Sequence, residues 1–202
     1  MSWIQRRRSE TYYRRAKTEG YRSRAIYKLK QMDEKFSLIG NGMRILDLGA
    51  APGGWSQYSS MVNEEGLNVA MDLVPMRRIE NVYFVKGDIF EDNIWTKVLE
   101  LSPDGFDLVL SDILMHTSGD RSRDQANSYF IAKRVLEICE HVLARNGKTL
   151  IKTLQGDLTE EMRREFKKHF RRVFLTKPSS SLPRSPELYI LGEYYSGHSP
   201  SP

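Results

Sequence analysis

The run Asp-Leu-Gly-Ala-Ala-Pro-Gly-Gly-Trp at residues 47–55 constrains the fold more than any other part of the chain. It follows the largely apolar residues 43–46 and precedes a stretch of helical character that reaches Met61. A β-strand ending in a carboxylate, a glycine-rich turn and a helix together form the first unit of a doubly wound α/β sheet. The sequence therefore predicts a ligand site at this turn.

The chemistry of the turn narrows the choice of ligand. Gly49, Gly53 and Gly54 allow the backbone to approach a flat ligand closely. The dinucleotide fingerprint would need a glycine at Ala51, and a phosphate-binding loop would end in Gly-Lys-Ser or Gly-Lys-Thr. The turn contains no lysine or arginine, and Asp47 opens it. An adenosine ligand without phosphates, such as the positively charged S-adenosylmethionine, fits these features. The alternative is an ordinary strand-to-helix turn.

The rest of the chain continues the alternation of strands and helices in one domain. Strands are expected at 44–48, 67–73, 83–85, 106–112, 148–154, 172–176 and 188–195, and helices at 23–36, 54–63, 94–101, 125–144 and 160–170. Ser23 is expected to cap the first of these helices. A polar loop is expected at 113–124 and a turn at 145–147. The last strand is expected to close the sheet as an antiparallel edge.

Charged side chains stand at the carboxyl ends of several predicted strands. Such ends face the ligand crevice of a doubly wound sheet, so the sequence predicts that these side chains converge. Asp72 follows Gly53 by 19 residues, where such folds place the carboxylate that binds the ribose. Asp88 is positioned to accept a hydrogen bond from an adenine amino group. The converging residues are Asp47, Asp72, Asp88, Asp112 and Lys152.

Lys152 lies among apolar residues in a predicted central strand. A lysine there costs free energy unless it is paired or partly neutral, which favours a functional role. The equally weighted alternative is a lysine that reaches the surface or pairs with Asp112 for structural reasons.

The positive charge of the chain is concentrated at its amino terminus. The 202 residues carry a net charge of +5, yet residues 1–35 alone hold eleven Lys/Arg against four Asp/Glu. Phosphate contact and base stacking need basic and aromatic side chains, which predicts an RNA-binding arm at residues 1–22. A solvated, partly disordered arm is the alternative. The residues concerned are Arg6, Arg7, Arg8, Arg14, Arg15, Lys17, Arg22 and Arg24, with Tyr12, Tyr13 and Tyr21.

Composition excludes several other classes of protein. No apolar run approaches the length of a membrane span, and the first residues lack the pattern of a secretory signal, so we expect a cytoplasmic protein without membrane contact. The single cysteine, Cys139, excludes internal disulfides. The four histidines lack ligand spacing, and we expect no metal site.

The motifs along the chain resemble those of the FtsJ/RrmJ (RlmE) family of ribosomal RNA 2′-O-ribose methyltransferases. The resemblance extends from about Tyr21 to Tyr194. It is carried by residues 23–29 (Ser-Arg-Ala-Ile-Tyr-Lys-Leu), 47–58, 72–76, 87–88, 111–112, 152–156 (Lys-Thr-Leu-Gln-Gly), 177–178 and 184–189. One departure is visible after Asp112, where the family usually continues Met-Ala-Pro-Asn and this chain has Ile-Leu-Met-His at 113–116.

This resemblance implies a Rossmann-like class I S-adenosylmethionine-dependent methyltransferase, with a seven-stranded, mostly parallel sheet and helices on both faces. The catalytic tetrad of the family corresponds to Lys28, Asp112, Lys152 and Glu187. Its cofactor contacts correspond to Gly53, Trp55, Asp72, Asp88 and Asp112. The resemblance further implies that Lys152 takes the proton of a ribose hydroxyl, a role that requires a lowered pKa.

The resemblance also implies a substrate. We expect methylation of a uridine of 23S ribosomal RNA, within the large ribosomal subunit, by a monomer with a methyltransferase domain at 23–195 and a disordered tail at 196–202. A tRNA anticodon-loop or mRNA-cap 2′-O-methyltransferase shares the same catalytic layout. A non-catalytic RNA-binding module and a nucleotide-dependent oxidoreductase are the alternatives outside this class.

Overall fold

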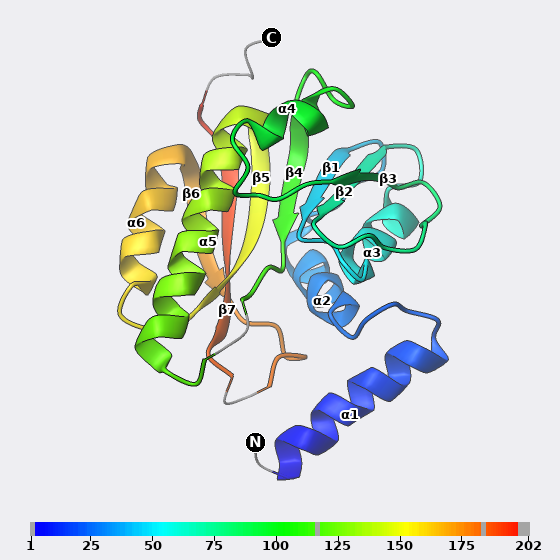
Figure 1. Ribbon diagram of the computed structural model, residues 1–202, viewed down its shortest axis with the longest axis vertical. Coiled ribbons are helices and arrows are strands. Elements are labelled where there is room, and N and C mark those ends of the chain that lie inside the picture. The colour runs from blue at the N-terminus through cyan, green and yellow to red at the C-terminus, as the bar shows by residue number, and fades with distance from the viewer. Residues whose placement is uncertain (1–2, 116–117, 183–184, 198–202) are drawn as a thin grey trace.

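The computed structural model describes residues 3–115, 118–182 and 185–197. Their strands form one sheet in the order β3-β2-β1-β4-β5-β7-β6 (Figure 1). The strands are β1 (Arg44–Leu48), β2 (Leu67–Asp72), β3 (Tyr83–Lys86), β4 (Phe106–Ser111), β5 (Leu143–Leu154), β6 (Phe170–Thr176) and β7 (Glu187–Tyr195). The helices are α1 (Trp3–Thr18), α2 (Ile26–Phe36), α3 (Gly54–Val62), α4 (Ile94–Leu99), α5 (Arg121–Val142) and α6 (Thr159–His169).

Two apolar clusters pack on opposite faces of the sheet. Helices α4, α5 and α6 cover one face, where Ile94, Val135 and Phe166 are buried. Helices α2 and α3 cover the other, where Leu29 and Trp55 are buried. Strand β4 contributes side chains to both clusters, as expected of a central strand of a parallel sheet. The predicted mostly parallel seven-stranded sheet with helices on both faces is thus confirmed.

The predicted place of the last strand was wrong. Strand β7 is antiparallel, but it lies between β5 and β6 instead of at the edge. Its residues 188–193 are all buried, which is typical of a strand covered on both faces. Strand β6 forms the edge, and its Arg171 and Arg172 are exposed. Periodicity identified both strands, whereas their order depends on long-range pairing.

Three local expectations also need correction. Ser23 does not cap α2, which begins at Ile26 after Ala25 without a side-chain cap. Helix α5 begins earlier than expected because the Asp120 carboxylate accepts hydrogen bonds from the Ser122 and Arg123 amides. Residues 145–147, expected as a turn, lie within β5 at a break in its pairing with β4, and Asn146 has a φ of 65°.

The amino-terminal segment forms helix α1, which projects from the domain in Figure 1. Near its end Ala16 is buried, and Tyr12 and Tyr21 pack against Tyr27 with ring centroids 5.3 and 5.9 Å away. Of the three tyrosines proposed for base stacking, Tyr13 is therefore the freely exposed one. Residues 198–202 of the predicted tail lie outside the described residues. No described helix is both long and apolar enough to span a lipid bilayer.

Candidate active site

The turn after β1 has a backbone that glycine alone adopts without strain. Gly49 and Gly53 have φ values of 70° and 103°. A Cβ atom on Gly49 would lie 2.1 Å from Cγ1 of Ile113, so the loop after β4 packs directly on bare backbone. Gly54, the third glycine of the motif, starts α3, and a Cβ there would lie 2.2 Å from the Ser23 hydroxyl.

We expect Gly49→Ala to destabilise the protein more than Gly42→Ala. Both positions have positive φ, which costs alanine about 1 kcal/mol or more, but Gly42 has open space around its Cα. The difference in free energy of unfolding between the two variants, measured in urea, isolates the clash with Ile113. Ligand affinity should fall only for Gly49→Ala. Equal stability of the two variants would mean that Ile113 moves away freely.

A cavity of about 1140 Å³ opens beside this turn at the carboxyl ends of β1, β2 and β4. Asp72, Asp88 and Asp112 line it together with apolar side chains such as Leu73 and Phe90. The Asp72 carboxylate accepts hydrogen bonds from the amides of Ala51 and Val74, both at 2.8 Å. Asp88 accepts one from the Phe90 amide at 2.9 Å. Carboxylates above an apolar surface suit a ligand with hydroxyl, amino and aromatic groups.

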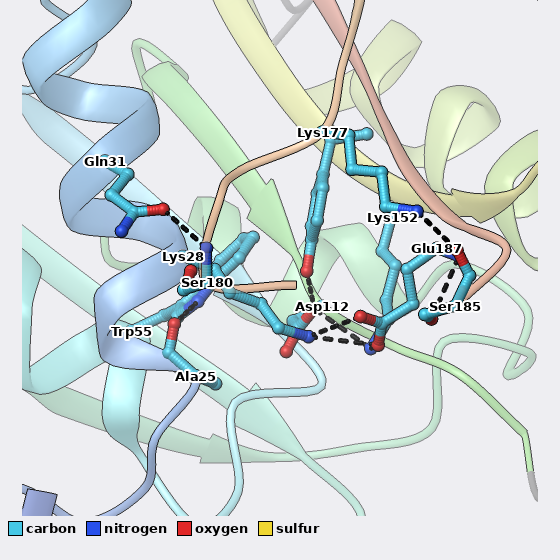
Figure 2. Close-up of polar contacts among 11 residues, drawn as sticks. Ala25, Lys28, Gln31, Trp55, Asp112, Lys152, Lys177, Ser180, Ser185 and Glu187 are labelled. Atoms are coloured by element: carbon cyan, nitrogen blue, oxygen red, sulfur yellow. Dashed lines mark hydrogen bonds and ion pairs between the residues drawn. The ribbon is translucent and has the colours of Figure 1, made fainter. Parts of the chain in front are cut away.

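The four residues matched to the catalytic tetrad meet in a second, smaller cavity of about 290 Å³. Figure 2 shows their side chains converging from α2, β5, the end of β4 and the start of β7. The Lys28 ammonium lies 3.0 Å from both Glu187 oxygens. The Lys152 ammonium lies 3.1 Å from Asp112 and 3.2 Å from Glu187. Each carboxylate therefore holds Lys152 from one side.

The loop after β6 lies over this cluster; one hydrogen bond joins its middle to α2, and another joins its two ends. Gln31 of α2 accepts a hydrogen bond from the Ser180 amide at 2.9 Å, and Lys177 donates to the Ser185 carbonyl at 2.5 Å (Figure 2). Residues 183–184 of this loop, and His116 of the unusual loop after β4, lie outside the described residues. Glu187 follows Ser185 by two residues and so lies next to the end of the loop that Lys177 holds.

The surroundings of Lys152 act on its pKa in opposite directions. Burial favours its neutral amine, and the side chain is only 8% exposed. The carboxylates of Asp112 and Glu187 outweigh that effect, so the pKa of Lys152 is raised above its usual value. Burial raises the pKa of Glu187, but the positive charges of Lys28 and Lys152 outweigh it and hold that pKa below its usual range. The lowered pKa that a base role requires is thus not present in the free protein.

Two of the residues matched to cofactor contacts, Gly53 and Trp55, do not line the larger cavity. Trp55 is buried, donates from its indole nitrogen to the Ala25 carbonyl at 2.9 Å, and lines the smaller cavity. Gly53 packs against Ile79 and Met76. Asp47 is fully buried under the turn, where burial raises its pKa to about 7 although the Ser56 hydroxyl donates to it at 2.5 Å.

Sequence reasoning missed Tyr189, whose hydroxyl donates to the Asp112 carboxylate at 2.7 Å. Tyr189 is fully buried on β7 with its ring centroid 5.8 Å from that of Trp55, and its position two residues after Glu187 was the available indication. Among the described residues, no three His, Cys, Asp or Glu side chains are grouped so as to hold a metal ion.

Comparison with known proteins adds independent evidence. Residues 21–195 match the family described as FtsJ-like methyltransferase. The chain is 40% identical over 195 residues to "Ribosomal RNA large subunit methyltransferase E" of Legionella pneumophila strain Corby, covering 96% of this chain and 95% of that protein. The strain Lens protein of the same name is 39% identical. A solved Plasmodium falciparum structure, described as a ribosomal RNA methyltransferase, superposes with a TM-score of 0.81 at 29% identity, covering 88% of this chain and 100% of that one.

Proposed function

Since this chain belongs to the FtsJ-like methyltransferase family, it is a methyltransferase, and we propose that it methylates a ribose 2′-hydroxyl in RNA of the large ribosomal subunit with S-adenosylmethionine as donor. The target expected from the resemblance is a uridine of 23S ribosomal RNA. The enzyme would act in the cytoplasm, where ribosomal subunits are available to it.

One observation carries the proposal: the two cavities adjoin at Asp112, which lines both of them together with Gly49, Ala51 and Pro52. The larger one has the carboxylates and apolar surface that an adenosine-containing donor requires. The smaller one holds Lys28, Lys152 and Glu187. A donor in the first and a ribose in the second would meet at Asp112, which favours transfer over simple binding.

The residues of the smaller cavity have distinct roles in this proposal. When bound, S-adenosylmethionine supplies an electrophilic methyl group next to a positive charge. Lys152 would accept the proton of the 2′-hydroxyl at Nζ, and Asp112 and Glu187 would hold that amine in line with the hydroxyl. Because Lys152 is an ammonium in the free protein, it must lose its proton first. Burial and nearby positive charge, including Lys28, favour that loss.

The basic arm supports RNA as the substrate. Arg14 and Lys17 are exposed on α1, and Tyr13 is 63% exposed beside them. We propose that α1 contacts RNA phosphates and that residues 23–195 perform the transfer. Tyr12 and Ala16 pack against the domain, so this packing fixes the place where α1 leaves it.

We expect the double variant Arg14→Gln, Lys17→Gln to bind RNA more weakly. Each lost phosphate contact should reduce the slope of log K against log salt by about 0.7–0.9, since fewer counterions are released. The measurement is a salt titration of RNA binding, with Arg145→Gln, exposed at the start of β5, as the control. An unchanged slope would assign α1 another role.

The target is tested by mapping the methylated nucleotide. The protein is incubated with isotope-labelled S-adenosylmethionine and one RNA substrate per reaction. The substrates are large ribosomal subunits, free ribosomal RNA, tRNA and capped mRNA. We expect label in a ribose of the large-subunit RNA. Label in tRNA or in the cap would replace this target by one of its alternatives, and transfer to none of these RNAs would contradict the proposed activity.

A further inference from the structure

Arg22 connects the two loops that border the larger cavity. Its guanidinium donates to the Pro52 carbonyl at 3.3 Å, the Arg77 carbonyl at 2.6 Å and the Arg78 carbonyl at 2.6 Å. Pro52 belongs to the glycine turn after β1, whereas Arg77 and Arg78 belong to the segment after β2. One side chain thus bridges segments that are 25 residues or more apart in sequence.

Both bridged segments form walls of the cavity. Residues 72–77 line it along one side and Ala51 and Pro52 along another, and Arg22 itself is a lining residue. Leu73 and Val74 are 55% and 60% exposed, so burial does little to hold this segment in place. Its described anchors include the hydrogen bond of the Val74 amide to Asp72, the half-buried Met76 beside Gly53, the buried Ile79 and the hydrogen bonds of Arg22. Arg22 therefore supplies two hydrogen bonds that hold this wall in place.

The backbone around Arg22 is itself held rigidly. The Arg22 amide donates to the Gln57 side chain of α3 at 3.0 Å, and the same side chain donates to the Gly20 carbonyl at 3.2 Å. Gly53 leaves the space that the arginine stem occupies, because a Cβ there would lie 3.2 Å from Cδ of Arg22. This packing gives Gly53 a role without direct ligand contact.

We propose that Arg22 is a positioning residue for the methyl donor: its planar fork fixes the glycine turn relative to residues 73–78 and so shapes the donor cavity. This inference rests on the proposed function for the identity of the donor. A planar guanidinium can donate to carbonyls in several directions at once, whereas a lysine ammonium at the same place cannot span both segments. The geometry also moves Arg22 from the predicted arm of residues 1–22 to the catalytic domain.

The test compares Arg22→Ala and Arg22→Lys with the wild type and with Arg171→Ala, an exposed arginine on β6 that serves as a control for lost charge. Calorimetric titration with S-adenosylmethionine should give a Kd at least about tenfold higher for both Arg22 variants and an unchanged Kd for Arg171→Ala. The KM for the donor should rise similarly, while kcat at saturating donor stays within about threefold of wild type. A lower kcat with an unchanged KM would indicate a merely structural role and overturn the proposal, as would Kd values within twofold of wild type.

A second measurement does not depend on the donor. In the ligand-free full-length protein, Arg22→Ala should accelerate hydrogen exchange of the amides in residues 73–81 and leave those of α5 and β4 unchanged. Unaltered exchange in residues 73–81 would overturn the proposal even if S-adenosylmethionine were the wrong donor. Failure of wild-type protein to bind S-adenosylmethionine would instead count against the proposed function.

Discussion

Replacing Lys152 by alanine is expected to slow methyl transfer at least ~100-fold while donor binding is retained, because a positioned general base contributes at least that factor. This corresponds to about 2.7 kcal/mol of transition-state stabilisation. Lys152 is held by Asp112 and Glu187 at 3.1 and 3.2 Å, at the point where the two cavities adjoin. The measurement is single-turnover transfer to RNA, with donor affinity determined separately by calorimetry.

Two further variants separate the roles that Lys152 could have. Lys148→Ala removes a lysine from the same strand, where it binds the Ser37 carbonyl, and should leave the rate unchanged. Lys152→Arg keeps a positive charge but cannot lose its proton near neutral pH, so a base role predicts a variant as slow as Lys152→Ala. If Lys152→Arg retains most of the wild-type rate, Lys152 acts through its charge and position. Near-normal turnover of Lys152→Ala would remove it from the mechanism altogether.

Replacing Glu187 by glutamine is expected to change both the maximum rate and its dependence on pH. In the wild type the pKa of Lys152 is raised, so the fraction of neutral amine and hence the rate should increase as pH rises through the neutral range. Loss of the Glu187 charge removes one cause of the raised pKa and leaves Lys28 as an uncompensated neighbour, so the profile should move to lower pH. The maximum rate should fall about tenfold or more, because the amine loses a positioning partner.

The control for this experiment is Glu193→Gln on the same strand. Glu193 is buried and lies 3.8 Å from the Lys148 ammonium, remote from the cluster at the start of β7. It should leave the pH profile of transfer unchanged. A Glu187→Gln profile at the wild-type position would show that proton loss from Lys152 does not limit the rate.

The sequence predicted those parts of the fold that depend on local pattern. The glycine turn predicted the first strand-turn-helix unit. The carboxylates at strand ends, Asp72, Asp88 and Asp112, predicted residues that line the larger cavity. The place of β7 inside the sheet could not be inferred, because it depends on pairing between segments far apart in the chain. Likewise, the pairing of Glu187 with Lys28 and Lys152 came from the family resemblance and not from spacing.

The direction of the pKa shift of Lys152 could not be predicted without the distances to its charged neighbours. The sequence placed Lys152 in an apolar strand, which by itself favours a lowered pKa, and gave no measure of how close the opposing carboxylates would be. Two of them within 3.2 Å reverse the direction of the shift. The bridge formed by Arg22 was equally invisible, since its partners are backbone carbonyls, which no side-chain pattern reveals.

The composition of strand β6 has a consequence for how copies of this protein meet. An unpaired sheet edge offers hydrogen-bonding groups to any extended chain and invites self-association. Here the open edge displays the guanidinium groups of Arg171 and Arg172, with Lys167 and Lys168 on the helix just before it. Two such β6 edges would repel each other, so this strand disfavours edge-to-edge association at its own end of the sheet, opposite the β3 edge.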